Sequence, residues 1–283
     1  MYLVDKSMFF EKMENAGHFL FLVRPRRFGK SLFLDMLEAY YDINEKDNFQ
    51  KLFKGMYVAD HPTTEQGEFQ VLHLDFSMVG SDLENLYENF NKYCGAVVDD
   101  FIDSYQRLYS PQAIERIHGE NTAAGKLNIL RLEAKRARFK LYLIVDEYDN
   151  FTNNVLNVKG QQAYHELTHG TGFYRDIFKI FKPMFDRIIM LGVSPITLDD
   201  LTSGYNIALN MSLDARFNQM LGFSEQDVRQ MIRYYKEVGA IGEDKTEDAI
   251  INDIKRGTTT TASRKGASQL SLRCSTATWF AII

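Results

Sequence analysis

Four short apolar runs, each bounded by polar residues, predict the strands of one sheet. They lie at residues 18–23, 70–76, 140–146 and 187–193. The third run is apolar at every position from Leu141 to Val145, which is typical of a central parallel strand covered on both faces. We therefore expect an α/β fold in which a mainly parallel central sheet is flanked by helices.

The segments between and after these strands predict helices. The same pattern divides the chain into three regions. We expect a core at residues 1–221, a small helical subdomain at 222–256 and an aberrant tail at 257–283. The polar stretch Asn150–Lys159 predicts a loop. The expected helices are residues 30–42, 81–109, 111–117, 122–138, 161–185 with an interruption near 170–172, 224–238 and 245–254.

The first apolar run leads into a basic loop, Arg24–Gly29 (RPRRFG), and Lys30 and Ser31 open the helix that follows. Strand, loop, Lys, hydroxyl and helix follow the layout of a P-loop. Backbone N–H groups of such a loop and of the helix N-terminus face an anion, which the helix dipole also favours. Lys30 would then reach the β- and γ-phosphates, and the Ser31 hydroxyl would hold Mg²⁺. The further residues expected to contact the nucleotide are Arg26, Arg27, Phe28, Gly29 and Leu32.

The loop departs from the pattern G-x-x-x-x-G-K-[ST], because Arg24 stands where that pattern has glycine. Pro25 also fixes a φ angle that is usually free in such a loop. The alternative interpretation is a basic strand-to-helix turn, so a partner motif is needed.

The third apolar run supplies that partner, because it ends in an acidic segment and reads LYLIVDEYD over Leu141–Asp149. Asp146 at the tip of the strand would hold Mg²⁺ through water, and Glu147 would polarise an attacking water. Taken alone, the segment is equally a buried strand with solvated acids at its end. Both motifs, however, follow strands at the edge where open α/β sheets bind ligands. Together they predict a P-loop NTPase.

Five segments together resemble the AAA-ATPase-like family of bacteria: RPRRFGKSLFLDML, VLHLDFS, VDEYDNF, HGTGFYRDIFK and LGVSPITLDDL. The resemblance runs from about Tyr2 to about Lys255. In this family RPRRFGKS is the usual Walker A form, so Arg24 agrees with the family pattern. The resemblance implies ATP rather than GTP, with Mg²⁺, and hydrolysis by the module. It also suggests assembly into a homo-oligomer.

Several members of that family carry a C-terminal PD-(D/E)XK nuclease-like domain, and no part of this chain matches one. Nucleic acid would therefore be a partner only indirectly, through a missing domain. In AAA-type ATPases a polar residue at a neighbouring strand tip senses the γ-phosphate, which makes Ser194 and Thr197 candidates; the alternative role is a helix N-cap. Asp75 either lies near the site or caps the next element, and Arg216 is a sensor or finger arginine or forms a surface salt bridge.

Composition narrows the remaining classes. The chain has 283 residues and only two cysteines, and the low cysteine count excludes a disulfide framework. Its net charge of −5 does not suggest a dedicated nucleic-acid binder. No apolar run approaches the roughly 18 residues of a membrane helix, and the N-terminus lacks the features of a signal peptide. We expect a cytoplasmic protein without membrane contact.

A competing motif is HELTH, a literal H-E-x-x-H at residues 165–169. On one helix face His165 and His169 would bind zinc, with Glu166 as the general base of a metalloprotease. Arg175 stands where an extended motif requires the third ligand, and arginine does not ligate a metal. Zinc proteolysis is therefore the remote alternative.

From Gly257 the chain lacks Asp and Glu and is dominated by Thr and Ser. This composition predicts a disordered terminus or the product of a frameshift. On the second hypothesis the gene is interrupted after about Lys255 and the module is truncated. A truncated module would bind nucleotide without turnover, which is the leading alternative function.

Overall fold

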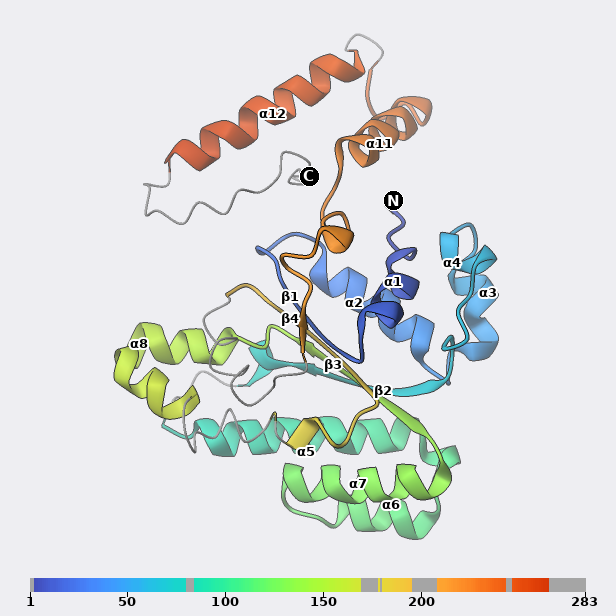
Figure 1. Ribbon diagram of the computed structural model, residues 1–283, viewed down its shortest axis with the longest axis vertical. Helices are drawn as coiled ribbons and strands as arrows, with labels where there is room; N and C mark the ends of the chain where they lie inside the picture. Colours follow the sequence, from blue (N-terminus) through green and yellow to red (C-terminus); the bar gives the residue numbers. More distant parts are fainter. Residues whose placement is uncertain are drawn as a thin grey trace.

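The computed structural model describes residues 3–79, 84–168, 178, 180–194, 208–242 and 246–264. Its centre is a five-stranded sheet in the order β2-β3-β4-β1-β5, and every pairing is parallel (Figure 1). The strands are β1 (Phe19–Val23), β2 (Phe69–Asp75), β3 (Lys140–Asp146), β4 (Arg187–Gly192) and β5 (Leu209–Asn210). The four predicted strands and the α/β fold class are confirmed. The two-residue β5 escaped prediction because so short a segment has no apolar run.

Helices precede, connect and follow the strands. The α-helices are α1 (Phe9–Ala16), α2 (Lys30–Tyr41), α3 (Phe49–Leu52), α4 (Tyr57–Asp60), α5 (Leu86–Ser104), α6 (Pro111–His118), α7 (Ala123–Ala137), α8 (Asn150–Thr168), α11 (Glu225–Glu237) and α12 (Glu247–Arg264). Short 3₁₀ helices are η1 (Lys46–Asn48), η2 (Phe76–Met78), η3 (Gln106–Leu108) and η4 (Ala215–Phe217).

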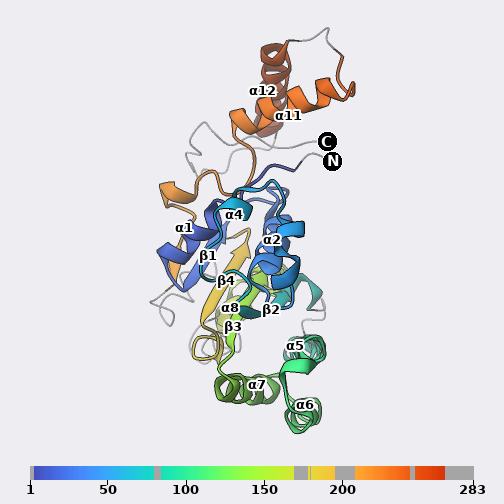
Figure 2. The same ribbon diagram turned by 90° about the vertical axis from the view of Figure 1, so that its right-hand side faces the viewer.

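The sheet is buried on both faces because alternate strand residues enter two different hydrophobic clusters. On β3, Leu141, Leu143 and Val145 belong to one cluster, and Tyr142 and Ile144 belong to the other. Helices α5, α6 and α7 cover the first face, whereas α1, α2 and α3 cover the second (Figure 2). The protein core is therefore a three-layer arrangement of helices, sheet and helices.

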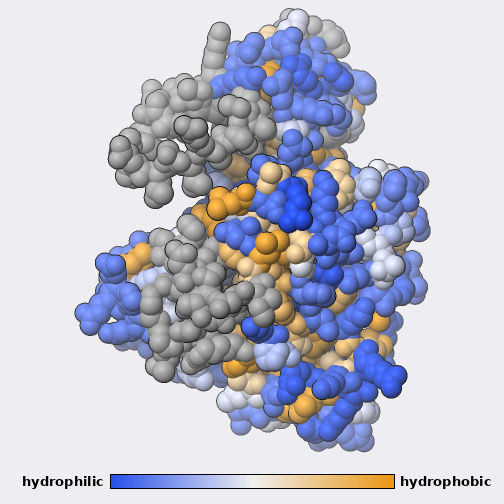
Figure 3. Space-filling model, in the orientation of Figure 1, coloured by the Kyte–Doolittle hydropathy of each residue, from blue (hydrophilic) through white to orange (hydrophobic). Residues whose placement is uncertain are grey.

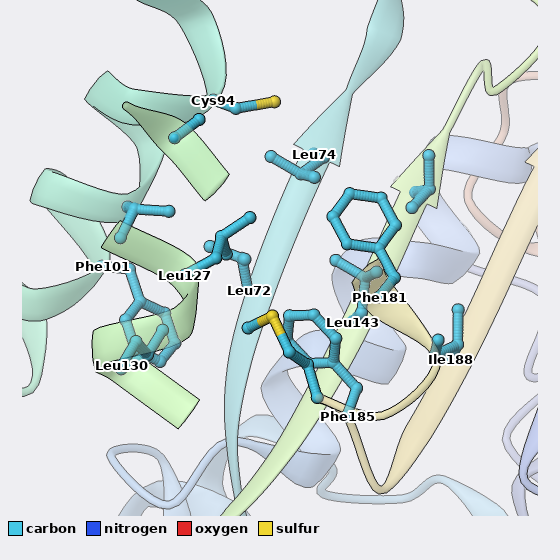
Figure 4. Packing of buried hydrophobic residues seen from close by; sticks show 14 of the residues in the cluster. Leu72, Leu74, Cys94, Phe101, Leu127, Leu130, Leu143, Phe181, Phe185 and Ile188 are labelled. Carbon is cyan, nitrogen blue, oxygen red and sulfur yellow. The ribbon is translucent and has the colours of Figure 1, made fainter. Parts of the chain in front are cut away.

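The first face is closed by a helical insertion between β2 and β3. Ser110 caps α6 by accepting the Ala113 N–H, and Thr122 caps α7 by accepting the Gly125 N–H. Figure 4 shows Leu127 of α7 beside Leu72 of β2, and Leu130 of α7 belongs to the same hydrophobic cluster as Leu143 of β3. The insertion thus fixes the two strands that end in Asp75 and Asp146.

The prediction of a loop at residues 150–159 is wrong, because α8 begins at Asn150 and includes this whole segment. Thr152 and Val155 are buried while neighbouring polar side chains lie outside, so the segment is an amphipathic helix. Its polar composition concealed the narrow apolar face. The helix is kinked at Gly160, whose φ of +83° is left-handed.

The C-terminal pair α11 and α12 packs with few apolar contacts. Ile232 and Ile251 are buried, and much of the remaining contact is ionic: Arg233 pairs with Glu247 at 2.8 Å, and Arg229 pairs with Asp248 at 2.8 Å. The surface of this pair, at the top of Figure 3, is mostly hydrophilic. Helix α12 continues to Arg264, past the expected end at residue 254, and residues 265–283 of the tail lie outside the described residues.

No helix in the described part of the chain is long and apolar enough to span a membrane.

Leu143 lies in the middle of β3 and is fully buried. We expect Leu143→Ala to lower the free energy of unfolding by about 2–5 kcal/mol, because truncation leaves a cavity in a close-packed core. Urea unfolding followed by circular dichroism measures the change. The matched control is Leu52→Ala on α3, where the side chain is 47% exposed and the cost should stay within about 0.5 kcal/mol. Equal losses in the two variants would contradict the assigned burial.

Candidate functional site

The loop between β1 and α2 has the backbone conformation that an anion-binding turn requires. Gly29, the N-cap of α2, has φ +77° and ψ +26°, and Arg27 is also left-handed with φ +69°. Gly29 offers no side-chain oxygen to the first-turn N–H groups of α2. This helix N-terminus favours negative charge.

Arg24, at the position where the general pattern has glycine, anchors the start of the loop. Its N–H donates to the Gly192 carbonyl at 3.1 Å. Its Nη1 donates to the carbonyls of Val23 at 3.0 Å and Ser212 at 3.2 Å. Ser212 in turn accepts the Val23 N–H at 2.8 Å through Oγ. The arginine therefore ties the loop to β4 and to the segment after β5.

Lys30 is buried at the start of α2 and turns back over the loop. Its Nζ donates to the carbonyls of Arg24 at 3.2 Å and Pro25 at 3.4 Å. Burial lowers the pKa of the Lys30 ammonium, and the charges of Glu147, Asp146 and Asp149 oppose that shift. A buried cation thus lies within the field of three carboxylates, from the last residue of β3 and the turn that follows it.

Ser31 and Asp146 join the two predicted motifs directly. The Ser31 hydroxyl donates to Oδ2 of Asp146 at 2.9 Å. Asp146 is 5% exposed, and burial raises the pKa of its carboxyl, whereas the hydrogen bond from Ser31 lowers it. The neighbouring charge of Asp75, which pairs in register with Asp146, raises it further. A hydroxyl and a carboxylate oxygen form a donor set that suits a hard divalent cation such as Mg²⁺.

Glu147 follows Asp146 in a left-handed conformation with φ +48°. Its N–H donates to Oδ1 of Asp146 at 2.8 Å, and its Oε2 accepts the Asn150 amide at 3.0 Å. The side chain is half-buried and its charge acts on Lys30. The structure therefore brings Lys30, Ser31, Asp146 and Glu147 together.

Ser194 lies at the tip of β4, and its backbone is held by Tyr148 and Asp149. The sequence motifs assigned no role to these two residues. The Ser194 N–H donates to Oδ2 of Asp149 at 2.5 Å, and its carbonyl accepts the Tyr148 hydroxyl at 2.9 Å. The signal for them was their place in the same DEYD segment. Thr197, the other sensor candidate, lies outside the described residues.

The other predicted nucleotide-binding residues divide into exposed and buried ones. Arg26 and Arg27 are exposed on the loop, and Leu32 is 47% exposed on the first turn of α2. Phe28 is buried in the core cluster of α1 and α2, and its carbonyl accepts the Gly222 N–H at 3.0 Å. The Phe28 side chain therefore packs in the core, which leaves only its backbone at the loop.

Asp75 and Arg216 have local partners. Asp75 caps η2 by accepting the Ser77 N–H at 2.9 Å, while it also lies beside Asp146 on the adjacent strand. Arg216 is exposed and pairs with Asp214 at 2.5 Å, which is a surface salt bridge.

The two residues of the H-E-x-x-H motif that the structure describes and that would act with zinc are at the surface. His165 and Glu166 are exposed on α8, and Gln162 donates to Glu166 at 3.3 Å. His169 and Arg175 lie outside the described residues. Within the part of the chain that the structure covers, no group of three or more His, Cys, Asp or Glu side chains is placed to hold a metal.

A strand, a loop that ends in Gly29, and a helix that opens with Lys30 and Ser31 lie at the carboxyl edge of an all-parallel sheet, which is the arrangement of a P-loop NTPase. The family comparison agrees with this class. The profile described as Predicted AAA-ATPase matches residues 1–202, and the chain belongs to this family.

Two individual proteins are similar to the chain. An uncharacterized protein encoded in the vnfD 5′ region of Azotobacter chroococcum is 29% identical over 232 residues, which cover 80% of this chain and 40% of that protein. The ORC2 protein of Aeropyrum pernix, solved with ADPNP and ADP, aligns over 93% of this chain and 63% of its own, with a TM-score of 0.38 and 10% identity. The chain thus spans less than two thirds of the length of either protein.

Gly192 at the end of β4 lies against the acidic turn. A Cβ there would lie 2.4 Å from Cε1 of Tyr148 and 2.6 Å from Oδ1 of Asp149. We expect Gly192→Ala to cost about 1–3 kcal/mol of unfolding free energy, because overpacking forces both groups to shift. Thermal and urea unfolding measure the loss.

Gly95→Ala on α5 is the matched control. The nearest atom to its added Cβ is Cε of Lys126 at 3.9 Å. This variant should be neutral or more stable by about 0.5–1 kcal/mol, because alanine favours a helix. A Gly192→Ala protein as stable as Gly95→Ala would contradict the close approach at β4.

Proposed function

We propose that this protein binds ATP with Mg²⁺ and hydrolyses it. The observation that carries the proposal is the 2.9 Å hydrogen bond between Ser31 and Asp146, which joins the phosphate loop to the acidic strand tip. Each motif alone has a plain structural interpretation. Their direct contact, beside a buried lysine, favours one nucleotide site built from both.

The loop residues would bind the phosphates. The open N-terminus of α2 at Gly29 presents N–H groups, and Lys30 places an ammonium next to the same loop. Arg26 and Arg27 add exposed positive charge on the loop. On nucleotide binding, Lys30 would exchange the carbonyls of Arg24 and Pro25 for phosphate oxygens, which are stronger acceptors.

Ser31 and Asp146 would hold Mg²⁺, since their oxygens already lie within hydrogen-bonding distance of each other. When bound, the ion neutralises charge on the phosphates. Asp146 then has to be deprotonated, and Lys30 nearby favours that state.

Glu147 would orient the attacking water and accept its proton, and Ser194 would sense the γ-phosphate. Glu147 has a backbone φ of +48°, and its carboxylate accepts the Asn150 side-chain amide at 3.0 Å. Adenine rather than guanine as the base rests on membership of the Predicted AAA-ATPase family. Assembly into a homo-oligomer is proposed on the same ground.

Calorimetry of ATP binding with and without Mg²⁺, paired with phosphate release on the same sample, tests the proposal. Binding that Mg²⁺ strengthens, together with release, is expected. Binding without release would support a nucleotide-binding module that does not turn over, and no binding would overturn the assignment.

Lys30→Ala should weaken ATP binding roughly ten- to hundredfold, because hydrogen bonds to charged groups contribute about 1.5–3 kcal/mol. The measurement is the dissociation constant by calorimetry. Lys51→Ala, an exposed lysine on α3, is the control and should bind ATP as the unmodified protein does. Equal affinity in the two variants would contradict the role of Lys30.

Glu147→Gln should lower the rate of phosphate release roughly 10²–10⁴-fold, because the amide cannot accept the proton of the attacking water. The ATP dissociation constant should change little. Glu115→Gln, at an exposed position on α6, is the control for loss of one surface carboxylate. The role of Glu147 is wrong if both variants release phosphate at the same rate.

A further inference from the structure

We propose that Tyr148 and Asp149 are positioning residues for the reaction at Glu147, because they lock the acidic turn after β3 to the tip of β4. The inference rests on the proposed ATP hydrolysis. Neither side chain is assigned to the nucleotide, to Mg²⁺ or to the attacking water. Their role follows from where their hydrogen bonds go.

Asp149 directs its carboxylate away from its own turn. The residue is 1% exposed, and both of its oxygens accept the Val193 N–H at 3.2 Å. Oδ2 also accepts the Ser194 N–H at 2.5 Å and the Asn153 amide at 2.9 Å. A buried carboxylate is costly unless donors surround it. These donors come mainly from the end of β4. The Asp149 carboxylate therefore binds that backbone and is not a metal ligand.

Tyr148 makes a second connection to the same strand end. Its ring is fully buried, its N–H donates to the Leu191 carbonyl at 3.1 Å, and its hydroxyl donates to the Ser194 carbonyl at 2.9 Å. Asp149 therefore holds the peptide N–H of Ser194, and Tyr148 holds its carbonyl. The Ser194 side chain is positioned through a backbone that cannot turn without breaking both hydrogen bonds.

Gly192 makes this close approach possible and extends it to the phosphate loop. A side chain at Gly192 would collide with the Tyr148 ring and the Asp149 carboxylate. The Gly192 carbonyl accepts the Arg24 N–H at 3.1 Å. One chain of contacts thus runs from the first residue of the loop, through the end of β4, to the turn that carries Glu147.

The contacts to β4 matter for Glu147 because its backbone has an unfavourable conformation. A non-glycine residue with φ +48° is strained, and such a conformation persists only where the surrounding structure determines it. Asp146 before it is fixed in the β3 ladder, and Tyr148 and Asp149 after it are fixed to β4. Loosening either contact to β4 should let Glu147 relax out of the orientation that its proposed role requires.

The test uses Tyr148→Phe and Asp149→Asn in the full chain. Phenylalanine removes one hydroxyl and keeps the ring, whereas asparagine replaces one acceptor oxygen by a donor that faces the Ser194 N–H. We expect kcat for phosphate release to fall roughly ten- to hundredfold, the size of effect that a small misplacement of a reacting group produces. In Tyr148→Phe the calorimetric dissociation constant for ATP should stay within about twofold, since this change removes no charge near Lys30 and no phosphate contact.

Tyr105→Phe is the matched control. The Tyr105 side chain is also buried, and its hydroxyl donates to Asp42 at 2.9 Å and accepts the Val71 N–H at 2.9 Å, away from the acidic turn. It should lose stability and keep its kcat. If Tyr148→Phe and Asp149→Asn lower kcat no more than Tyr105→Phe does, the two residues are only structural and the inference is overturned.

Amide hydrogen exchange supplies a readout that does not depend on turnover. Peptides covering residues 188–194 should exchange faster in both variants than in the unmodified protein or in Tyr105→Phe. Unchanged exchange there would overturn the proposed connection even if kcat fell. Absence of phosphate release from the unmodified protein would instead refute the proposed function, and exchange would still decide whether the connection exists.

Discussion

Parallel hydrogen bonding of β1 and β3 to the central strand β4 brings three carboxyl ends to one edge of the sheet, and the whole candidate site depends on that alignment. Val23 pairs with Gly192, and Val145 pairs with Met190. The residues that follow these three strands therefore lie side by side along the carboxyl edge of the sheet. The 2.9 Å contact between Ser31 and Asp146, 115 positions apart in sequence, is a consequence of this register.

Burial of opposite charges is the second physical feature of the site. Desolvation lowers the pKa of Lys30 and raises that of Asp146, so burial alone disfavours both charged forms. Each charge favours ionisation of the other, and the loop carbonyls and the Ser31 hydroxyl supply hydrogen-bonding partners. Charged groups held out of water in this way are prepared for a charged ligand, which offers stronger partners than the protein itself.

The backbone around the site is unusual at the two places where the chain leaves a strand. Arg27 and Gly29 are left-handed before α2, and Glu147 is left-handed after β3. Regular structure follows at once in both cases, because α2 and α8 begin within a few residues. Strain is thus confined to the turns and is sustained by contacts to β4 from Arg24, Tyr148 and Asp149.

Local apolar runs and short spacings were enough to predict the four principal strands, the α/β class and the two motifs that contain Lys30 and Asp146. The motif set also allowed membership of the Predicted AAA-ATPase family to be anticipated from the sequence. Contacts between distant segments were needed to show that Phe28 packs inward and that the Asp149 carboxylate accepts the N–H groups of Val193 and Ser194. Residues 150–159 are helical because a narrow face of the segment is buried. The two residues of β5 form a strand because they pair with β1. Such contacts join residues far apart in the chain, so no local pattern records them.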